Sequence, residues 1–252
     1  MIIQVIGLPG SGKTTFASEL KDKINAVHLN ADYVRSTINS DLGFTIEDRI
    51  EHSRRLGEMA RMLSGQGYIV VVDFICPTKT TRDAFGKPNI LVWMNTIKEG
   101  RFEDTNKLWE DPVNVDIQYA DFSDDINLRV KEFCKLFNIH DWSEPTTLML
   151  GRYQPWHEGH HALYSEAEKR TKQVMLGIRN TYATSPKDPL RFNEVKHYID
   201  QDPYMADAMV VKLPNITNIV YGRDVGYKIE QVELPPEIQA ISATQKRKEM
   251  GI

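Results

Sequence analysis

The feature that most constrains the fold is a glycine-rich turn near the amino terminus. Residues 7–14 read GLPGSGKT and satisfy the pattern GxxxxGK[ST] in full. An apolar run at 2–6 precedes this turn, and a stretch with helical periodicity at 13–24 follows it. A strand, a tight turn and a helix in this order are typical of the first unit of a parallel sheet. The sequence therefore predicts an α/β fold that begins with this unit.

The composition of the turn suits the binding of phosphate groups. Glycines let backbone N–H groups close around a phosphate, and the amino terminus of the following helix adds a favourable dipole. We expect Lys13 to act as a catalytic cation at the β- and γ-phosphates of ATP, and the Thr14 hydroxyl to ligate Mg²⁺. The strand–turn–helix context disfavours the alternative of a glycine turn that binds nothing. The residues expected to bind the nucleotide are Gly7, Gly10, Ser11, Gly12, Lys13, Thr14 and Thr15.

Apolar runs of strand length continue to alternate with helical stretches along the chain, which predicts two α/β domains in series. The first, at 1–140, is expected to hold the P-loop and a parallel sheet, with strands at 27–30, 68–73 and 90–94 and helices at 47–66 and 124–137. Residues 138–146 are polar, contain a proline and show no periodicity, so they are expected to form a linker. The second domain, at 146–252, is expected to be smaller and Rossmann-like, with strands at 147–150, 173–178 and 208–212 and helices at 159–170, 191–199 and 242–250.

Composition narrows the class of partner. The formal net charge is −4, which gives no reason to expect a nucleic acid or an anionic membrane as partner. The apolar runs are too short to span a bilayer, and the first residues lack the basic segment of a signal peptide. Only Cys76 and Cys134 are present, which fits a reducing compartment. We therefore expect a cytoplasmic enzyme that acts on small molecules. Assembly into a homo-oligomer stays open.

Three blocks of the first domain resemble the adenylylsulfate kinase family in order and spacing. LNADYVR at 29–35 is similar to the family's LDGDNVR, and NSDLGFTIEDRIEHSRR at 39–55 resembles its NxDLGFxxxDRxENxRR. DFICPTKTTRD at 73–83 is similar to its SFISPxRxxRD. The resemblance implies an ATP-dependent kinase that transfers a phosphoryl group to a hydroxyl.

The same resemblance implies roles for six further residues. Asp32 would lie beside Mg²⁺ and the acceptor hydroxyl, as a base or orienting group. Arg35 and Arg49 would grip the acceptor's phosphate or sulfate. Phe44 would sandwich the acceptor's base against Phe74 or Ile75. Without the family match, Asp32 could equally be a helix N-cap, and isolated arginines are more often solvated than bound to a ligand.

The chain departs from the family pattern at points that concern the acceptor. Asn30 replaces the first acidic residue of LDGD, and His52 replaces the Asn of ENxRR. Asp73 replaces the Ser before FISP and could hold Mg²⁺ through water, as a Walker-B acid does. The family's carboxy-terminal lid is absent. Residues 96–112 stand in its place and offer cations that could face phosphate, namely Lys98, Arg101 and Lys107. The identity of the acceptor therefore stays open.

A second pair of motifs lies in the second domain. GRYQPWHEGH at 151–160 resembles the GRFQPxHxGH block of adenylyl- and cytidylyltransferases, most of all the nicotinamide-mononucleotide adenylyltransferases. ISATQKR at 241–247 is similar to their ISxTxxR block, and residues 221–224 (YGRD) fall where a turn near the nucleotide is expected. His157, His160 and Arg247 would act on the triphosphate. A structural histidine pair or an adventitious metal site is the alternative. The expected nucleotide-binding residues are Gly151, Arg152, Gly159, Ser242 and Thr244.

Taken together, the motifs predict a bifunctional transferase that uses ATP and Mg²⁺. One domain would phosphorylate a hydroxyl of a nucleotide-like acceptor. The other would transfer a nucleotidyl group to a small anion with release of pyrophosphate. The first alternative is an adenylylsulfate kinase in sulfate activation. The second is a nucleotide-sensing protein with one inactive domain.

Overall fold

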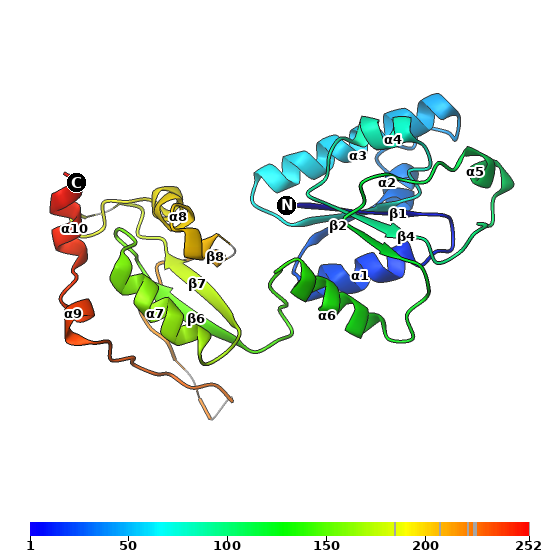
Figure 1. Ribbon diagram of the computed structural model, residues 1–252. Helices are drawn as coiled ribbons and strands as arrows, with labels where there is room; N and C mark the ends of the chain where they lie inside the picture. Colours follow the sequence, from blue (N-terminus) through cyan, green and yellow to red (C-terminus); the bar gives the residue numbers. More distant parts are fainter. Residues whose placement is uncertain (184, 207, 221, 224–225, 252) are drawn as a thin grey trace. The chain divides into compact units, whose positions relative to one another are not determined.

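The computed structural model describes residues 1–183, 185–206, 208–220, 222–223 and 226–251. The chain forms two compact units, Met1–Trp142 and Ser143–Ile252, and each holds a parallel sheet of its own (Figure 1). The predicted α/β fold class is confirmed.

The first unit is built on a five-stranded parallel sheet with the order β2-β3-β1-β4-β5. The strands are β1 (Ile2–Gly7), β2 (Val27–Asn30), β3 (Val70–Phe74), β4 (Ile90–Met94) and β5 (Ile117–Tyr119). Strands β1 and β3 are buried along their whole length, as expected of central strands covered on both faces. Because β1 and β3 are neighbours, the turn that follows β1 and the loop that follows β3 leave the sheet at the same edge.

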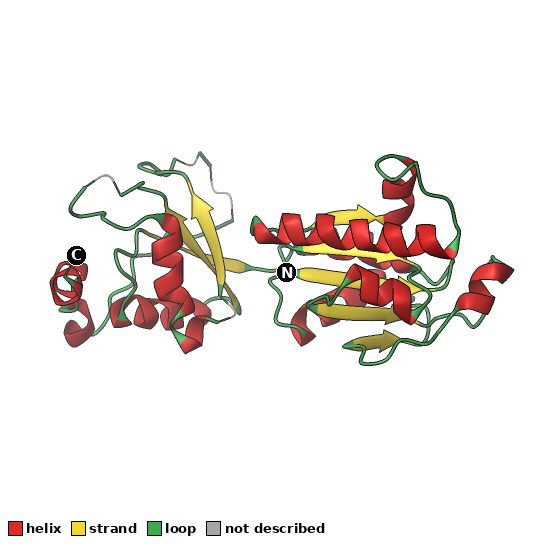
Figure 2. Cartoon of the chain, turned by 90° about the horizontal axis from the view of Figure 1, so that it is seen from above, coloured by secondary structure: helices red, strands yellow, loops and turns green. Residues whose placement is uncertain are grey.

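Helices cover both faces of this sheet (Figure 2). On one face, Phe16, Leu20 and Phe133 pack against Ile3 and Val92. On the other face, a second apolar cluster includes Leu56, Ala60 and Phe85. The helices are α1 (Lys13–Lys23), α2 (Ala31–Ser36), α3 (Ile46–Gly65), α4 (Lys79–Phe85), α5 (Glu103–Leu108) and α6 (Ile126–Leu136).

Two details of the first unit differ from the sequence-based expectation. The short elements α2, α4, α5 and β5 were not predicted, because runs of three to seven residues carry too little periodicity. The predicted linker, 138–146, begins before the first unit ends at Trp142. Ile139 belongs to the core of the first unit, and the backbone N–H of Trp142 donates to the Lys23 carbonyl at 2.7 Å.

The second unit is a single βαβαβ arrangement, which is one half of a doubly wound sheet. Its strands β6 (Thr146–Gly151), β7 (Gln173–Arg179) and β8 (Met209–Leu213) lie in sequential order. One core cluster joins Met149 and Leu176 of the sheet to Tyr164 of α7 (Glu158–Glu168) and Val195 of α8 (Phe192–Asp200). The remaining helical segments are η1 (Pro203–Met205), α9 (Pro236–Gln239) and α10 (Ala243–Met250).

Among the described residues, no helix is both long enough and apolar enough to cross a bilayer.

Candidate active sites

The glycine-rich turn after β1 adopts a backbone that its glycines make accessible. Gly12 caps the amino terminus of α1 with φ at 86°, and Gly10 has φ at 95°. Both values lie in the region that residues with a Cβ rarely adopt. Lys13 is buried, and its ammonium donates to the Leu8 carbonyl at 2.8 Å. Burial lowers the pKa of Lys13 to about 8, although the carboxylates of Asp73 and Asp32 oppose this shift.

Asp73 lies at the centre of a polar cluster beside this turn. The Thr14 hydroxyl donates to Asp73 Oδ2 at 2.6 Å, and His28 Nε2 lies 2.7 Å from Asp73 Oδ1. Asn30 Nδ2 donates to Asp73 Oδ1 at 3.0 Å, because Asn30 and Asp73 are register partners on β2 and β3. Burial alone would raise the pKa of Asp73, but the bonds from His28 and Thr14 outweigh it and lower the pKa.

Two of the residues that depart from the family pattern, Asn30 and Asp73, lie side by side in this cluster. The pattern has an acid at the end of β2 and a serine at the end of β3, whereas this chain has Asn30 and Asp73 at those places. The side chains of these two residues touch, so the Asp73 carboxylate lies at the same sheet edge as Asn30. Sequence comparison at single positions cannot show this, because the pairing depends on strand register.

The oxygen atoms of this cluster fit Mg²⁺. The Thr14 hydroxyl and the Asp73 carboxylate are hard donors at 2.6 Å from each other, the pair by which P-loop proteins hold the ion. No group of three or more His, Cys, Asp or Glu side chains in the described part of the chain could hold a metal. Mg²⁺ is usually bound through one or two carboxylates together with substrate phosphates.

A pocket beside Asp32 gathers the residues that the family resemblance assigns to the acceptor. Asp32 lies in the first turn of α2, and the helix N-cap is Asn30, whose side chain accepts from the Tyr33 N–H. The alternative role of Asp32 as an N-cap is therefore wrong. The residues around the pocket are Ala31, Asp32, Arg35, Phe44, Arg49, His52, Ser53, Phe74, Ile75, Cys76, Pro77 and Thr81.

The two arginines of the pocket converge on one aromatic ring. The guanidinium carbons of Arg35 and Arg49 lie 4.9 Å and 5.7 Å from the centroid of Phe44. Arg35 also donates to the Gly43 carbonyl, and Arg49 Nη2 lies 3.1 Å from Asp104 Oδ2. Neither arginine is simply solvated. Asp104 was not singled out in the sequence, since nothing in its own segment marks it as a partner of Arg49.

His52 is buried in the wall of this pocket. Its Nδ1 lies 2.9 Å from Asn39 Nδ2, so the amide of Asn39 fixes the neutral ring with its proton on Nε2. Burial and the neighbouring Arg35 lower the pKa of His52 to about 4. Cys76 in the same wall is fully buried, and burial raises the pKa of its thiol to about 12, so it is an inert packing residue.

Residues 96–112, which stand in place of the family's lid, contact the P-loop. The Thr96 hydroxyl donates to the Ser11 carbonyl at 2.9 Å. The positive charge of Arg101 is close enough to Lys13 to contribute to the lowering of its pKa. Lys107 is 2.7 Å from Glu103 on the same helix, so it is already paired. Of the three cations expected to face phosphate, Arg101 is the one whose charge acts on Lys13.

In the second unit, the two motif histidines lie face to face at the start of α7. The rings of His157 and His160 are stacked with centroids 3.8 Å apart. His157 is the N-cap of the helix, and its Nδ1 accepts from the Gly159 N–H at 3.1 Å. Burial, followed by the neighbouring His157, lowers the pKa of His160 to about 3. Burial also lowers the pKa of His157. Both rings are therefore neutral at physiological pH.

Arg247 connects the two motifs of this unit. It is buried on α10, and its Nη1 donates to the Gln154 carbonyl at 2.6 Å. Lys246 of the same helix lies 3.2 Å from Glu158 at the start of α7. Gln154 and Arg247 are 93 residues apart in the sequence, so their contact depends on the tertiary fold.

The other predicted nucleotide-binding residues of the second unit have structural partners. Arg152 lies 2.9 Å from Asp188, Ser242 caps α10 through the Gln245 N–H, and the Thr244 hydroxyl accepts from Arg247. A Cβ on Gly151 would lie 2.6 Å from the Tyr153 ring, so this position requires glycine. Of the expected 221–224 turn, only 222–223 are described, and Tyr221 and Asp224 lie outside the described residues.

The first unit is similar in sequence to known kinases. A family model described as adenylylsulphate kinase matches residues 1–94. A probable adenylyl-sulfate kinase of Aeropyrum pernix is 38% identical over 88 residues, which are 33% of this chain and 48% of that protein. The bifunctional enzyme NodQ of Rhizobium meliloti is 43% identical over 86 residues, which are 32% of this chain and 13% of that enzyme.

The first unit was also compared in structure with solved proteins. The Mycobacterium tuberculosis APS kinase CysC in complex with AMPPNP and APS has a TM-score of 0.46 and 24% identity, and the match covers 54% of this chain and 96% of that chain. The chain spans about half the length of the Aeropyrum relative and a smaller share of NodQ. The family match ends at Met94, the last residue of β4, just before the segment that departs from the family.

Proposed function

We propose that the first unit transfers the γ-phosphoryl group of ATP to a hydroxyl of a nucleotide-like, anionic acceptor. The observation that carries this proposal is the pocket that opens beside the P-loop with Asp32, two arginines and aromatic side chains in its wall. The similarity to adenylylsulfate kinases over residues 1–94 supports it. The chain departs from the family pattern at Asn30, at His52 and in the segment 96–112. We therefore name a class of acceptor rather than adenylylsulfate alone.

The residues of the first unit divide the work of phosphoryl transfer between them. The acceptor oxygen attacks the γ-phosphorus, ADP leaves, and the hydroxyl proton passes to Asp32. Lys13, held at the turn, stabilises the charge that develops on the phosphate oxygens. Arg35 and Arg49 orient the acceptor by its anionic group. Thr14 and Asp73 would hold Mg²⁺, which supplies charge neutralisation at the phosphates when bound.

The kinase proposal is tested by acceptor-dependent formation of ADP. Adenylylsulfate and a panel of nucleotide-like alcohols are incubated with ATP and Mg²⁺, and the products are weighed by mass spectrometry. We expect at least one acceptor to gain one phosphoryl group, and Lys13→Ala to abolish the gain. A protein that binds ATP but phosphorylates no member of the panel would leave the sensing role as the better account.

We further propose that the second unit transfers a nucleotidyl group to a small anion. The observation that carries this proposal is the bond from buried Arg247 to the Gln154 carbonyl, which brings the two motifs of the unit together beside the paired histidines. An oxygen of the acceptor anion would attack the α-phosphorus of a nucleoside triphosphate, and pyrophosphate would leave. Neutral His157 and His160 can donate hydrogen bonds to phosphate oxygens without a proton transfer.

Release of pyrophosphate tests the second proposal. ATP and CTP are each offered with sulfate, nicotinamide mononucleotide and other small phosphorylated anions. Release with one acceptor identifies the substrate, and His160→Ala should abolish it. Release with sulfate would favour the alternative of sulfate activation. A bifunctional arrangement is supported by analogy with the bifunctional enzyme NodQ.

A further inference from the structure

Residues 96–112 form a strap that reaches from the P-loop to the acceptor pocket. At its beginning, Thr96 is bonded to the backbone of Ser11, and a Cβ on Gly100 would meet Pro9 at 2.8 Å. Asn106 closes the loop before α5, since its side chain exchanges two hydrogen bonds with the backbone of Gly100. The strap therefore starts in close contact with the turn that binds the phosphates.

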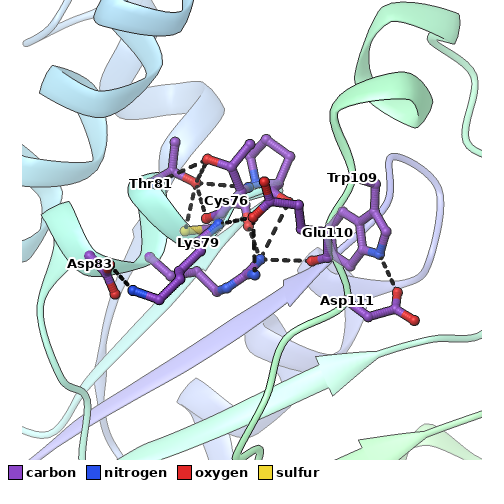
Figure 3. Close-up of polar contacts among 10 residues, drawn as sticks. Cys76, Lys79, Thr81, Asp83, Trp109, Glu110 and Asp111 are labelled. Atoms are coloured by element: carbon purple, nitrogen blue, oxygen red, sulfur yellow. Dashed lines mark hydrogen bonds and ion pairs between the residues drawn. The ribbon is translucent and has the colours of Figure 1, made fainter.

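The end of the strap is fixed to the loop between β3 and α4, which lines the acceptor pocket. Figure 3 shows Glu110 beside Lys79 and Cys76, with its side chain directed at the loop. The backbone N–H of Glu110 donates to the Pro77 carbonyl at 2.8 Å, and Arg82 Nη1 donates to the Glu110 carbonyl at 3.0 Å. Two anchored ends hold α5 between them.

From α5, Asp104 reaches the acceptor pocket. Its Oδ2 lies 3.1 Å from Nη2 of Arg49, whose side chain is only 11% exposed, while that of Asp104 is 67% exposed. Arg49 also donates from Nε to the Phe44 carbonyl at 3.0 Å. Nε and Nη2 lie on the same edge of the guanidinium, so the Phe44 carbonyl and the Asp104 carboxylate together occupy that edge. An acceptor anion on Arg49 would therefore bind next to the Asp104 carboxylate or in its place.

We infer that Asp104 is a specificity-determining residue that competes with the acceptor's anionic group for Arg49. The inference rests on the proposed kinase function. The charged residues that line the pocket are Asp32, Arg35 and Arg49, and their formal charges sum to +1. Asp104 pairs with Arg49 and offsets this charge. An anionic acceptor that pairs with Arg49 either displaces Asp104 from Nη2 or binds beside its like charge, whereas an uncharged acceptor meets neither cost. Asp104 therefore lowers the preference of the pocket for charged over uncharged acceptors.

The test compares two probes that differ in charge. Affinities for adenylylsulfate and for adenosine are measured by calorimetry with ADP and Mg²⁺ present, for the wild-type protein and for Asp104→Asn. We expect Asp104→Asn to bind adenylylsulfate about two- to fivefold more tightly, as the loss of a partly exposed ion-pair competitor implies. Its affinity for adenosine should not change. Because the competition is electrostatic, the gain should shrink as salt is raised.

Two control variants show whether the effect belongs to this contact. Glu103→Gln removes a charge from the same helix, but Glu103 is 83% exposed and pairs with Lys107, so this variant should behave as the wild type. In an Arg49→Gln background, Asp104→Asn should have no effect on adenylylsulfate affinity, since the group that both anions seek is gone.

Each outcome decides the matter. Equal or weaker binding of adenylylsulfate by Asp104→Asn would overturn the inference and leave the kinase proposal intact. An equal gain for adenosine and adenylylsulfate would also overturn it, because the strap would then act by obstruction rather than by charge. If neither the wild type nor Asp104→Asn binds adenylylsulfate, Arg49 does not bind this anion and the inference falls, whereas the acceptor panel decides the kinase proposal separately.

Discussion

The position of the carboxylate beside Thr14 gives the sharpest prediction. Asp73→Ser restores the serine of the family pattern but removes the only carboxylate that contacts Thr14 among the described residues. Changes to groups that hold or orient a metal typically cost ten- to a hundredfold in metal affinity or activity. We therefore expect the Mg²⁺ concentration for half-maximal ATP turnover to rise about ten- to a hundredfold.

A second substitution should reverse this loss. Asn30→Asp together with Asp73→Ser moves the carboxylate back to β2, and aspartate can still cap α2. We expect the double variant to recover most of the Mg²⁺ response. Asn30→Asp alone would place two carboxylates in contact, since the present Asn30–Asp73 bond is 3.0 Å long. Two charges at that distance repel by roughly 5 kcal/mol at an effective dielectric constant of about 20. This single variant should therefore lose stability or retain a proton.

The assay is Mg²⁺-dependent release of ADP by the first unit's site, with thermal unfolding as the check on folding. Asp22→Ser is the control, since Asp22 is an exposed carboxylate on α1. The reasoning would be refuted if Asp73→Ser kept the wild-type Mg²⁺ response. It would also be refuted if the double variant were no better than Asp73→Ser, because the carboxylate would then be tied to β3 for another reason.

Three further predictions concern packing and charge. Phe133→Ala should cost about 3–5 kcal/mol of stability, measured by denaturant unfolding, since Phe133 of α6 is fully buried in the core beside the sheet. Arg247→Met should abolish pyrophosphate release and lower the stability of the second unit, because it leaves the buried Gln154 carbonyl without its donor. Retention of pyrophosphate release would argue against a role for Arg247 at the triphosphate. The unfolded state binds a proton on His160 below about pH 6.5, whereas the folded state stays neutral until about pH 3. The second unit should therefore lose stability as pH falls from about 6.5 toward 3, and His160→Phe should flatten this slope in thermal unfolding.

Strands and long helices could be predicted from the sequence because their signals are local. The strands at 27–30 and 90–94 lie where they were expected, and α3 is displaced by one residue from its predicted bounds. The glycine-rich turn needs positive φ angles at Gly10 and Gly12, which glycine adopts readily, so its position could be predicted from its residues. The short elements α2 and α5 gave no such signal, since a helix of six residues shows less than two full periods.

The contacts of the candidate sites depended on tertiary structure. The pairing of Asn30 with Asp73 follows from the register of β2 and β3, and the pairing of Asp104 with Arg49 joins segments 55 residues apart. The family motifs indicated Arg49 as an anion ligand, but they could not indicate that this chain supplies a competing carboxylate. Because residues 96–112 follow no family pattern, their contacts could only be found in the folded chain.

The measurement that tests the central claim most directly is a comparison of two active-site variants in one assay. The wild type, Lys13→Ala and His160→Ala are incubated with ATP, CTP, Mg²⁺ and the acceptor panel, and phosphorylated and nucleotidylated products are followed by mass spectrometry. If the chain carries two separate transferase sites, Lys13→Ala loses only phosphorylated products and His160→Ala loses only nucleotidylated products. Loss of both product classes in either folded variant, or the absence of both in the wild type, would contradict the account.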